Sequence, residues 1–292
     1  MARWVQMKNI HIRAVLLVLL VLLLPGAADR LAAQTDRPET QSRDIPLQQD
    51  PDMSVDHTPW NRLLSKYLIR CEPEEGPNRI DYGALSANPK DRTALKAYLE
   101  DLASVAVSKL KPDPQFAFWA NLYNALTVDV VLSHYPARSI RTINISPGFF
   151  STGPWGAKLI TVESEKLSLD DIEHEILRPR WRDPRVHYAL NCASIGCPNL
   201  APKAYSPTTL EADLDAAARA YINSPRGVAV TKSGLRLSKI YDWYAEDFGD
   251  GQKGLLAHLT KYAGKALAQE LANHPRIVRY DYDWALNDAA QK

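Results

Sequence analysis

Residues 115–135 read QFAFWANLYNALTVDVVLSHY, an almost unbroken apolar stretch that decides the fold. Asp113 and Pro114 precede it as a helix cap and a first helical residue, and Pro136 follows it. Apolar side chains fall on nearly every side of a helical repeat, which is typical of a helix that is buried on most faces. The stretch therefore predicts a buried central helix.

Two asparagines interrupt this apolar helix. Asn121 and Asn124 are three residues apart and so share one face. A buried amide costs free energy unless it is hydrogen-bonded, so both side chains must have partners. They either tie the backbone of neighbouring loops to the helix, or orient a catalytic group or donate to an oxyanion.

The segment 187–198, HYALNCASIGCP, holds a histidine and two of the three cysteines of the chain. Residues 186–190 predict a buried strand, and a turn marked by glycine and proline follows. If the strand continued to Cys192, His187 would lie on the opposite face, because side chains alternate along a strand. A His187–Cys192 pair therefore requires that the strand end or bulge before Cys192.

A second histidine lies in the preceding helix. Ser168 and Asp171 have the spacing of a capping box, which predicts a helix to about residue 178. Glu173 and His174 are adjacent in this helix, and their side chains would diverge by about 100°. We therefore expect only one of them to face a site that contains Cys192.

The cysteines allow three kinds of chemistry. Cys192 could be a nucleophilic thiol, or it could form a disulfide with Cys197, since an exported chain meets an oxidising compartment. Zinc is the third alternative, with His187, both cysteines and His174 as ligands, but the spacing does not match common zinc motifs. Three cysteines cannot all pair within one chain, so the role of Cys71 is open.

The N-terminus resembles a secretory signal peptide. Three basic residues precede the apolar run 14–24, and Pro25-Gly26 and several alanines follow it. The run is too short to cross a bilayer, which needs about 20 residues. We predict a signal peptide over residues 1–28, with cleavage as late as 33, and export to the periplasm or the medium. An uncleaved N-terminal anchor is the alternative.

Residues 34–55 are polar and lack periodic apolar positions, which predicts a disordered linker. Residues 56–288 then form a single domain, long enough to bury a core. The formal net charge is +1, with 35 basic and 34 acidic residues, and no basic stripe indicates a nucleic-acid partner. No stable membrane span is expected once the signal is cleaved.

The remaining elements predict an α+β fold. Residues 228–238 indicate a hairpin, residues 255–271 a long helix and residues 276–282 a strand. Helices dominate, and the strands lie mostly in the second half. We expect a helix-rich body whose buried central helix packs on a small, mainly antiparallel sheet.

Four blocks of the sequence, in this order, resemble the domain of unknown function 547 family. They are FWANLYNALTVDVVLSHYP, SLDDIEHEILR, VHYALNCASIGCPNL and LSKIYDWYAEDFG. The resemblance covers roughly residues 60–265. It implies no activity, because the family is named for lacking one. In some plant relatives serine replaces the residue that matches Cys197, which implies that Cys192 is the special thiol.

The order of a long buried helix and then strands with histidine and cysteine is also similar, at the level of the fold, to the papain/transglutaminase class. In that class the nucleophile usually lies at the start of the central helix. Residues 115–121 contain no cysteine, so here the thiol would come from the strand side.

These residues together predict a cysteine-centred site that hydrolyses or transfers an acyl or amide group of a small-molecule or peptide substrate. Cys192 would be the nucleophile and His187 its base, with His174 as the alternative base. Glu173 would orient the imidazole. The expected site comprises Cys192, His187, His174, Glu173, Asn121 and Asn124.

The alternative is a non-catalytic binding or scaffold domain. The same cysteine, histidine, asparagine and glutamate residues would then form a structural polar network. Neither interpretation requires a cofactor or a metal ion.

Overall fold

The computed structural model describes residues 53–71, 76–148 and 151–291. The chain divides into residues 1–45 and residues 46–292, and every described residue belongs to the second unit. The predicted signal peptide (1–28) and nearly all of the predicted linker (34–55) lie outside the described residues. Among the described helices, none combines the length and apolar character needed to cross a bilayer.

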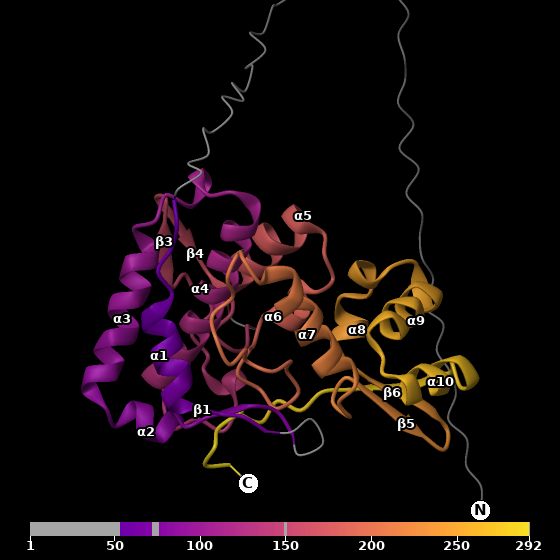
Figure 1. The fold of residues 1–292 in the computed structure, drawn as a ribbon. Helices are drawn as coiled ribbons and strands as arrows, with labels where there is room; N and C mark the ends of the chain where they lie inside the picture. The colour runs from indigo at the N-terminus through magenta and orange to yellow at the C-terminus, as the bar shows by residue number, and fades with distance from the viewer. Residues whose placement is uncertain (1–52, 72–75, 149–150, 292) are drawn as a thin grey trace, which may run out of the picture. The chain divides into compact units, whose positions relative to one another are not determined.

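The central helix α4 (Pro112–Ser133) confirms the main prediction from the sequence. Figure 1 shows α4 among the helices that surround it. All but a few of its side chains are buried. It begins earlier than predicted, with Pro112 in its first turn and Lys111 at the N-cap, so Asp113 lies in the first turn and does not cap the helix. Pro is favoured there because the first amide groups of a helix have no intrahelical partner.

Short and long helices surround α4. Before it come α1 (Thr58–Tyr67), α2 (Tyr82–Ser86), α3 (Pro89–Ala103) and η1 (Val107–Lys109). After it come η2 (Ile140–Thr142), η3 (Asp171–Leu177), α5 (Arg178–Trp181), α6 (Val186–Ala189), α7 (Leu210–Ile222), α8 (Ile240–Trp243), η4 (Ala245–Phe248), α9 (Gly251–Tyr262) and α10 (Lys265–Asn273). The main contacts of α4 are with α2, α3, η1 and η3.

The described strands form three separate small sheets. Two are antiparallel pairs: β1 (Leu68–Ile69) with β2 (Arg79–Ile80), and β3 (Ile160–Val162) with β4 (Glu165–Leu167). The third has the order β5 (Val228–Thr231), β6 (Gly234–Ser238), β7 (Ile277–Asp281), antiparallel and then parallel. The fold is thus α+β, but α4 packs mainly on helices where one sheet beneath it was expected.

Two local predictions were wrong. Residues 186–190 were expected to be a strand, yet Val186–Ala189 form the helical turn α6, because the short apolar run is buried in either conformation. The helix expected over 255–271 is divided into α9 and α10. At the break, the backbone N–H of Gly264 donates to the side chain of Asn223 at 2.6 Å.

The chain after β7 returns to the segment that carries the cysteines. The N–H of Ile195 donates to the carbonyl of Ala285 at 2.8 Å, and the N–H of Gly196 donates to that of Asp283 at 2.8 Å. A Cβ on Gly196 would lie only 2.8 Å from the Asp283 nitrogen, so this close approach requires glycine. The pairing fixes residues 282–286 beside residues 191–198, the cysteine loop.

Candidate functional site

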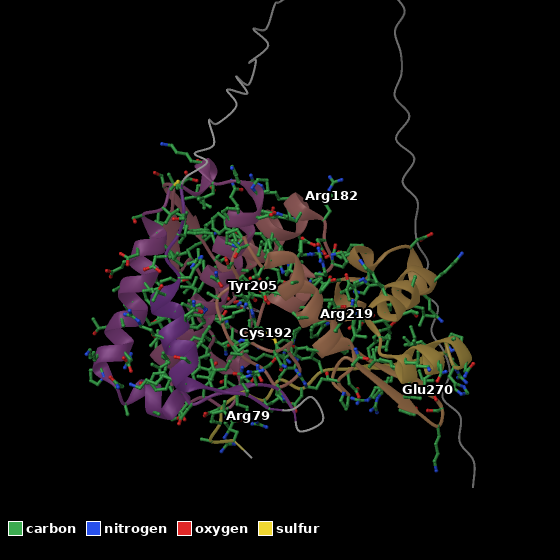
Figure 2. All side chains as sticks on the ribbon, in the orientation of Figure 1. Arg79, Arg182, Cys192, Tyr205, Arg219 and Glu270 are labelled. Atoms are coloured by element: carbon green, nitrogen blue, oxygen red, sulfur yellow. A yellow bond between two sulfur atoms is a disulfide. The ribbon has the colours of Figure 1, made fainter. Side chains whose placement is uncertain are left out.

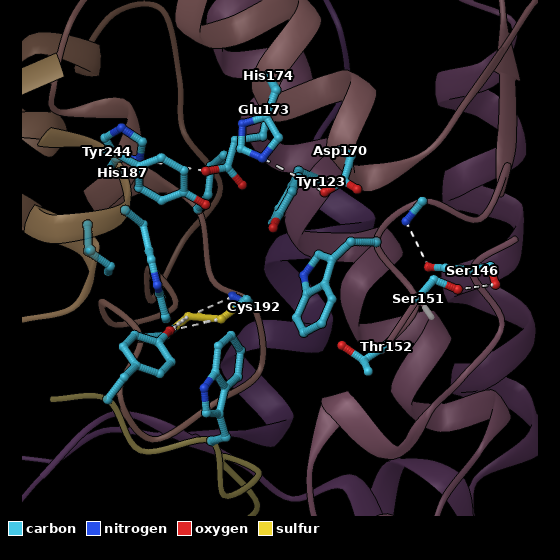
Figure 3. A pocket seen from close by; sticks show the side chains of 18 of the residues that line it. Tyr123, Ser146, Ser151, Thr152, Asp170, Glu173, His174, His187, Cys192 and Tyr244 are labelled. Carbon is cyan, nitrogen blue, oxygen red and sulfur yellow. Dashed lines mark hydrogen bonds and ion pairs between the residues drawn. A yellow bond between two sulfur atoms is a disulfide. The ribbon is translucent and has the colours of Figure 1, made fainter. Parts of the chain in front are cut away.

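A cavity of about 460 Å³ lies between the helices around α4 and the segment after β6. Its walls come from α4, η3, α6, α8, the cysteine loop and the chain after β7. Figure 3 shows Glu173, His174 and His187 toward one end of the cavity, with the Cys192 disulfide on another wall. The cavity is lined by Tyr123, Ser146, Pro147, Ser151, Thr152, Trp155, Gly156, Asp170, Glu173, His174, His187, Leu190, Cys192, Cys197, Pro198, Ile240, Trp243, Tyr244, Tyr282 and Trp284.

The element η3 is a π-helix, and it brings both Glu173 and His174 to the cavity. The predicted capping box precedes it: the N–H of Ser168 donates to Asp171 at 2.6 Å, and the N–H of Asp171 donates to Ser168 at 3.1 Å. The expectation that only one of Glu173 and His174 faces the site was therefore wrong. A π-helix turns less per residue than an α-helix, and such segments are frequent at functional sites.

His187 is held between two carboxylates. Its Nε2 lies 2.7 Å from Asp247 Oδ2, and its Nδ1 lies 3.6 Å from Glu173 Oε1. Its ring stacks on that of Tyr244, with centroids 4.3 Å apart. Burial works to lower the pKa of His187, but the two carboxylates outweigh it, so the pKa is raised. His187 thus has a carboxylate beside each ring nitrogen and favours the imidazolium form, which cannot accept a proton.

The strongest partner of His187, Asp247, was not among the residues predicted for the site. It also accepts a hydrogen bond from Nε of Arg178 at 2.6 Å. Partial burial acts to raise the pKa of Asp247, but the bonds from His187 and Arg178 prevail and lower it to about 2. Asp247 stands in the fourth sequence block quoted above, and that block was the only sequence signal for it.

Glu173 is an ionised carboxylate in the cavity wall. Its side chain is almost fully buried, and burial alone would raise its pKa. The His187 ring 3.6 Å away, the charge of His174 and the Tyr123 hydroxyl together hold the pKa of Glu173 below its usual value. Glu173 therefore faces His187 as the third member of an acid–histidine–acid row.

His174 lies at the rim of the same row. Its Nδ1 is 3.3 Å from Nη1 of Arg178, and its Nε2 is 3.8 Å from Asp170. Its side chain is 29% exposed, so it meets solvent as well as the cavity. His174 thus lies beside Asp170, just before η3, beside Arg178 of α5 and beside the Tyr244 ring, and no described hydrogen bond joins it to Cys192.

Cys192 and Cys197 form a disulfide, as Figure 3 shows. Figure 2 marks Cys192 near the middle of the described part of the chain. In this state Cys192 has no thiolate, so it is not the free nucleophile that was expected, and the His187–Cys192 pair is replaced by the His187–Asp247 pair. The disulfide also occupies both sulfurs that a zinc site would need. Within the described residues, no group of three or more histidine, cysteine or acidic side chains is arranged to hold a metal ion.

The two asparagines of α4 hold loops and do not line the cavity. Asn121 bonds both the carbonyl and the N–H of Tyr205, each at 2.9 Å. Asn124 donates to the carbonyl of Ala189 at 2.9 Å and accepts from the N–H of Asn191 at 2.8 Å. Because both amides are buried, they have no access to an oxyanion in the cavity. Asn124 instead positions the loop that carries Cys192.

Aromatic rings cover the wall that faces η3, and the sequence did not single them out. The centroid of the Trp284 ring lies 4.6 Å from that of Tyr282 and 5.5 Å from those of Trp243 and Trp155. Trp243 lines the cavity and is 39% exposed. The rings come from three separate segments, so no spacing in the sequence could have joined them.

Fold and site together define an α+β domain with an aromatic, acidic pocket that has a disulfide in one wall. Residues 107–222 match the family model described as "Protein of unknown function, DUF547". This part of the chain is therefore a DUF547 family domain. No curated protein and no solved structure matches the chain. The similarity to the papain/transglutaminase class stays a prediction. The matched residues include η3, α6 and the disulfide, whereas Trp243, Tyr282 and Trp284 lie beyond them.

Proposed function

We propose that the cavity binds a small organic ligand that carries a positively charged amine or quaternary ammonium group. The proposal rests on the kinds of residue that line the cavity. It contains the carboxylates Asp170 and Glu173 and a set of indole and phenol rings, and none of its described residues is lysine or arginine. Aromatic faces and carboxylates both attract cations, and the attraction grows when water is excluded.

The charge around the cavity supports a cationic ligand. Three carboxylates, Glu173, Asp247 and Glu246, share only two cations, His187 and Arg178, so this row keeps negative charge. Asp170 is half-exposed, and its only ion pair among the described residues is the long contact with His174. A cation in the cavity would therefore be held by carboxylates that internal pairs only partly neutralise.

The size and rigidity of the cavity support a small ligand. About 460 Å³ lies within the range of ligand pockets, roughly 300–1,000 Å³. The Glu173 end is fixed by α4 and η3, and the opposite wall is fixed by the pairing of residues 282–286 with the cysteine loop. A cavity whose walls are fixed in this way loses little conformational entropy on binding.

The test compares choline with its uncharged carbon isostere, dimethylbutanol, by ligand-observed NMR and by quenching of tryptophan fluorescence. We expect choline to bind at least about tenfold more tightly, because the two differ only in charge. Trp243→Ala and Asp170→Asn should each weaken choline binding. Trp181→Ala and Asp101→Asn, which alter residues outside the cavity, are the controls. Equal affinity of the two ligands would overturn the proposal.

A second candidate is the thiol-dependent hydrolysis or transfer of an acyl or amide group, in a form where the disulfide has been reduced. It is favoured by the place of Cys192 in the cavity wall, where its Sγ lies 3.2 Å from Ser194 Oγ and 3.1 Å from the Tyr282 hydroxyl. After reduction, iodoacetamide labelling at neutral pH should modify Cys192 faster than Cys71. Labelling at equal rates would reject this candidate.

We also propose that the chain is exported. The basic and apolar pattern at the N-terminus supports this proposal, as does a disulfide, which persists in oxidising compartments. N-terminal sequencing of the protein recovered from the periplasm or the medium should begin near residue 29 or as late as residue 34. Recovery only from the cytosol, with residue 1 retained, would contradict export.

A further inference from the structure

We propose that the Cys192–Cys197 disulfide exchanges with a thiol that enters the cavity, and that Cys192 is the sulfur attacked. This activity goes beyond the binding proposed above. It requires only that a thiol reach the cavity wall, whatever the charge of the ligand. Three features of the site favour this exchange: the access to each sulfur, the hydrogen bonds to each sulfur, and the bonds that hold the loop.

Access distinguishes the two cysteines. Both line the cavity, but Cys197 is only 3% exposed whereas Cys192 is half-buried. Thiol–disulfide exchange requires in-line approach of a thiolate to one sulfur, while the other sulfur leaves. An incoming thiolate therefore reaches Cys192 first, and Cys197 becomes the leaving group.

Hydrogen bonds favour Cys197 as the sulfur that carries the negative charge. The backbone N–H of Cys192 donates to Cys197 Sγ at 2.9 Å and is the bond that distinguishes this sulfur, and the Tyr282 hydroxyl, which lies 3.1 Å from each sulfur, can donate to it as well. Ser194 in turn donates to Tyr282 at 3.0 Å, which completes a short chain of donors. Burial raises the pKa of Tyr282 far above its usual value, so the phenol stays a neutral donor. A thiolate that accepts such bonds has a lower pKa and leaves faster.

A partly buried arginine adds positive charge on the same side. Arg226 donates through Nη1 to the carbonyl oxygen of Cys197 and through Nη2 to the side chain of Asn199 at 3.0 Å. None of the ion pairs among the described residues includes Arg226. Its charge therefore remains available to stabilise an anion at Cys197.

The exchange step balances without an external oxidant. The thiolate RS⁻ attacks Cys192 Sγ and forms an R–S–S–Cys192 bond, while the Cys192–Cys197 bond breaks and its electron pair leaves on Cys197 Sγ. One disulfide is consumed and one is formed. In the reverse step, Cys197 attacks Cys192 Sγ of the mixed disulfide and expels RS⁻.

The loop is held so that both directions remain possible. Asn191 donates to the carbonyl of Pro198 at 2.7 Å and accepts from the N–H of Ala193 at 2.9 Å, and Asn124 fixes Asn191 to α4. These bonds do not involve the sulfurs. They keep Cys197 beside Cys192 after the disulfide opens.

The experiment treats the full chain with cysteamine, quenches with N-ethylmaleimide and maps the adducts by mass spectrometry. Cys71→Ser removes the remaining described thiol, which is free. We expect cysteamine on Cys192 and maleimide on Cys197. Cysteamine found on Cys197, or a disulfide that opens only after denaturation, would overturn the proposal.

Two phenol variants separate the role of the donor from a structural role. Tyr282→Phe removes the bond to Cys197 and should slow the exchange about tenfold, and it should raise the pKa of Cys197 in the reduced protein. Tyr280→Phe, two residues earlier and outside the cavity, is the matched control and should change neither value. Equal exchange rates in both variants would show that Tyr282 does not assist the leaving group.

A second thiol distinguishes this proposal from cation binding. Mercaptoethanesulfonate carries a negative charge where cysteamine carries a positive one. If both thiols modify Cys192 at the same rate, exchange stands and the preference for a cation fails. If choline binds but neither thiol modifies Cys192, binding stands and exchange fails.

Discussion

Two walls of the cavity carry a candidate reactive side chain, and in each wall a different kind of bond occupies that side chain. On the wall formed by η3 and α6, His187 is neutralised by charge, with a carboxylate at each ring nitrogen. On the wall formed by the cysteine loop, the sulfur of Cys192 is bonded covalently to that of Cys197. His187 and Cys192 lie close in sequence and line one cavity, yet each has a partner of its own. Proximity in sequence therefore did not make them a catalytic pair.

The charged wall should depend most strongly on His187. His187→Leu leaves Glu173 buried without its cation, and an unpaired buried charge costs about 3–5 kcal/mol. Urea unfolding should show a loss of this size. His274→Leu removes an exposed histidine that lies 3.8 Å from Glu270 and should change the free energy of unfolding by less than about 1 kcal/mol. Similar losses in both variants would show that the row of charges does not stabilise the fold.

Asn124 supports the loop that carries the disulfide, and this support can be removed without changing either cysteine. Asn124→Leu deletes two hydrogen bonds to the backbone of Ala189 and Asn191 and leaves those groups buried. We expect a loss of about 2–3 kcal/mol and faster hydrogen exchange at the Asn191 amide. Asn121→Leu, which releases Tyr205, should cost a similar amount without changing exchange at Asn191. If exchange at Asn191 is the same in both variants, Asn124 does not hold the cysteine loop.

The covalent link itself should contribute less than the charged row. Only four residues separate Cys192 and Cys197, so closing this loop removes little entropy from the unfolded chain, worth about 2 kcal/mol. Reduction, or the double change Cys192→Ala and Cys197→Ala, should lower the free energy of unfolding by about that amount. Global unfolding on reduction would show that the disulfide, and not the charged row, stabilises the site.

The smallest effect should be that of pH. The pKa of Asp247 is about 2 in the folded protein, below its usual 3.8, so its contribution is lost as pH falls from about 4 to about 2. The pKa of His187 is raised above 6.5, so its contribution is present below that pH and lost as pH rises through the folded value. Stability should therefore be greatest between about pH 4 and pH 6.5, and the acid flank should cost about 1 kcal/mol, since Asp247 is partly exposed.

The loss of stability as the pH rises should come from the deprotonation of His187. His187→Gln should flatten the loss of stability above about pH 6.5, because glutamine does not titrate. His274→Gln should keep the flank unchanged. A flank that persists in His187→Gln would assign it to another group.

The sequence predicted those features that local patterns determine. The apolar helix α4, the hairpin of β5 and β6 and the capping box of Ser168 all depend on neighbouring residues, and all three are present. The strand predicted over residues 186–190 was wrong, because an apolar segment of five residues is consistent with a buried strand or with a buried helical turn.

The site was harder to predict because its decisive contacts are distant in sequence. Asp247 lies 60 residues after His187, and Tyr282 lies 85 residues after Cys197. Residue types identified the histidine and the cysteines, but no spacing indicates which distant side chain meets them. The disulfide was one of the alternatives left open, and only the fold brings Tyr282 to it.

The return of the chain after β7 also determines when the pocket can first exist. A protein is made from its N-terminus, and the disulfide, η3 and α6 can form before residues 282–286 have been synthesised. The aromatic wall cannot, because Tyr282 and Trp284 follow those elements in the chain, and the segment that carries them joins Gly196 through contacts of long sequence separation. The pocket is therefore completed only when residues 282–286 dock beside Cys192 and Cys197.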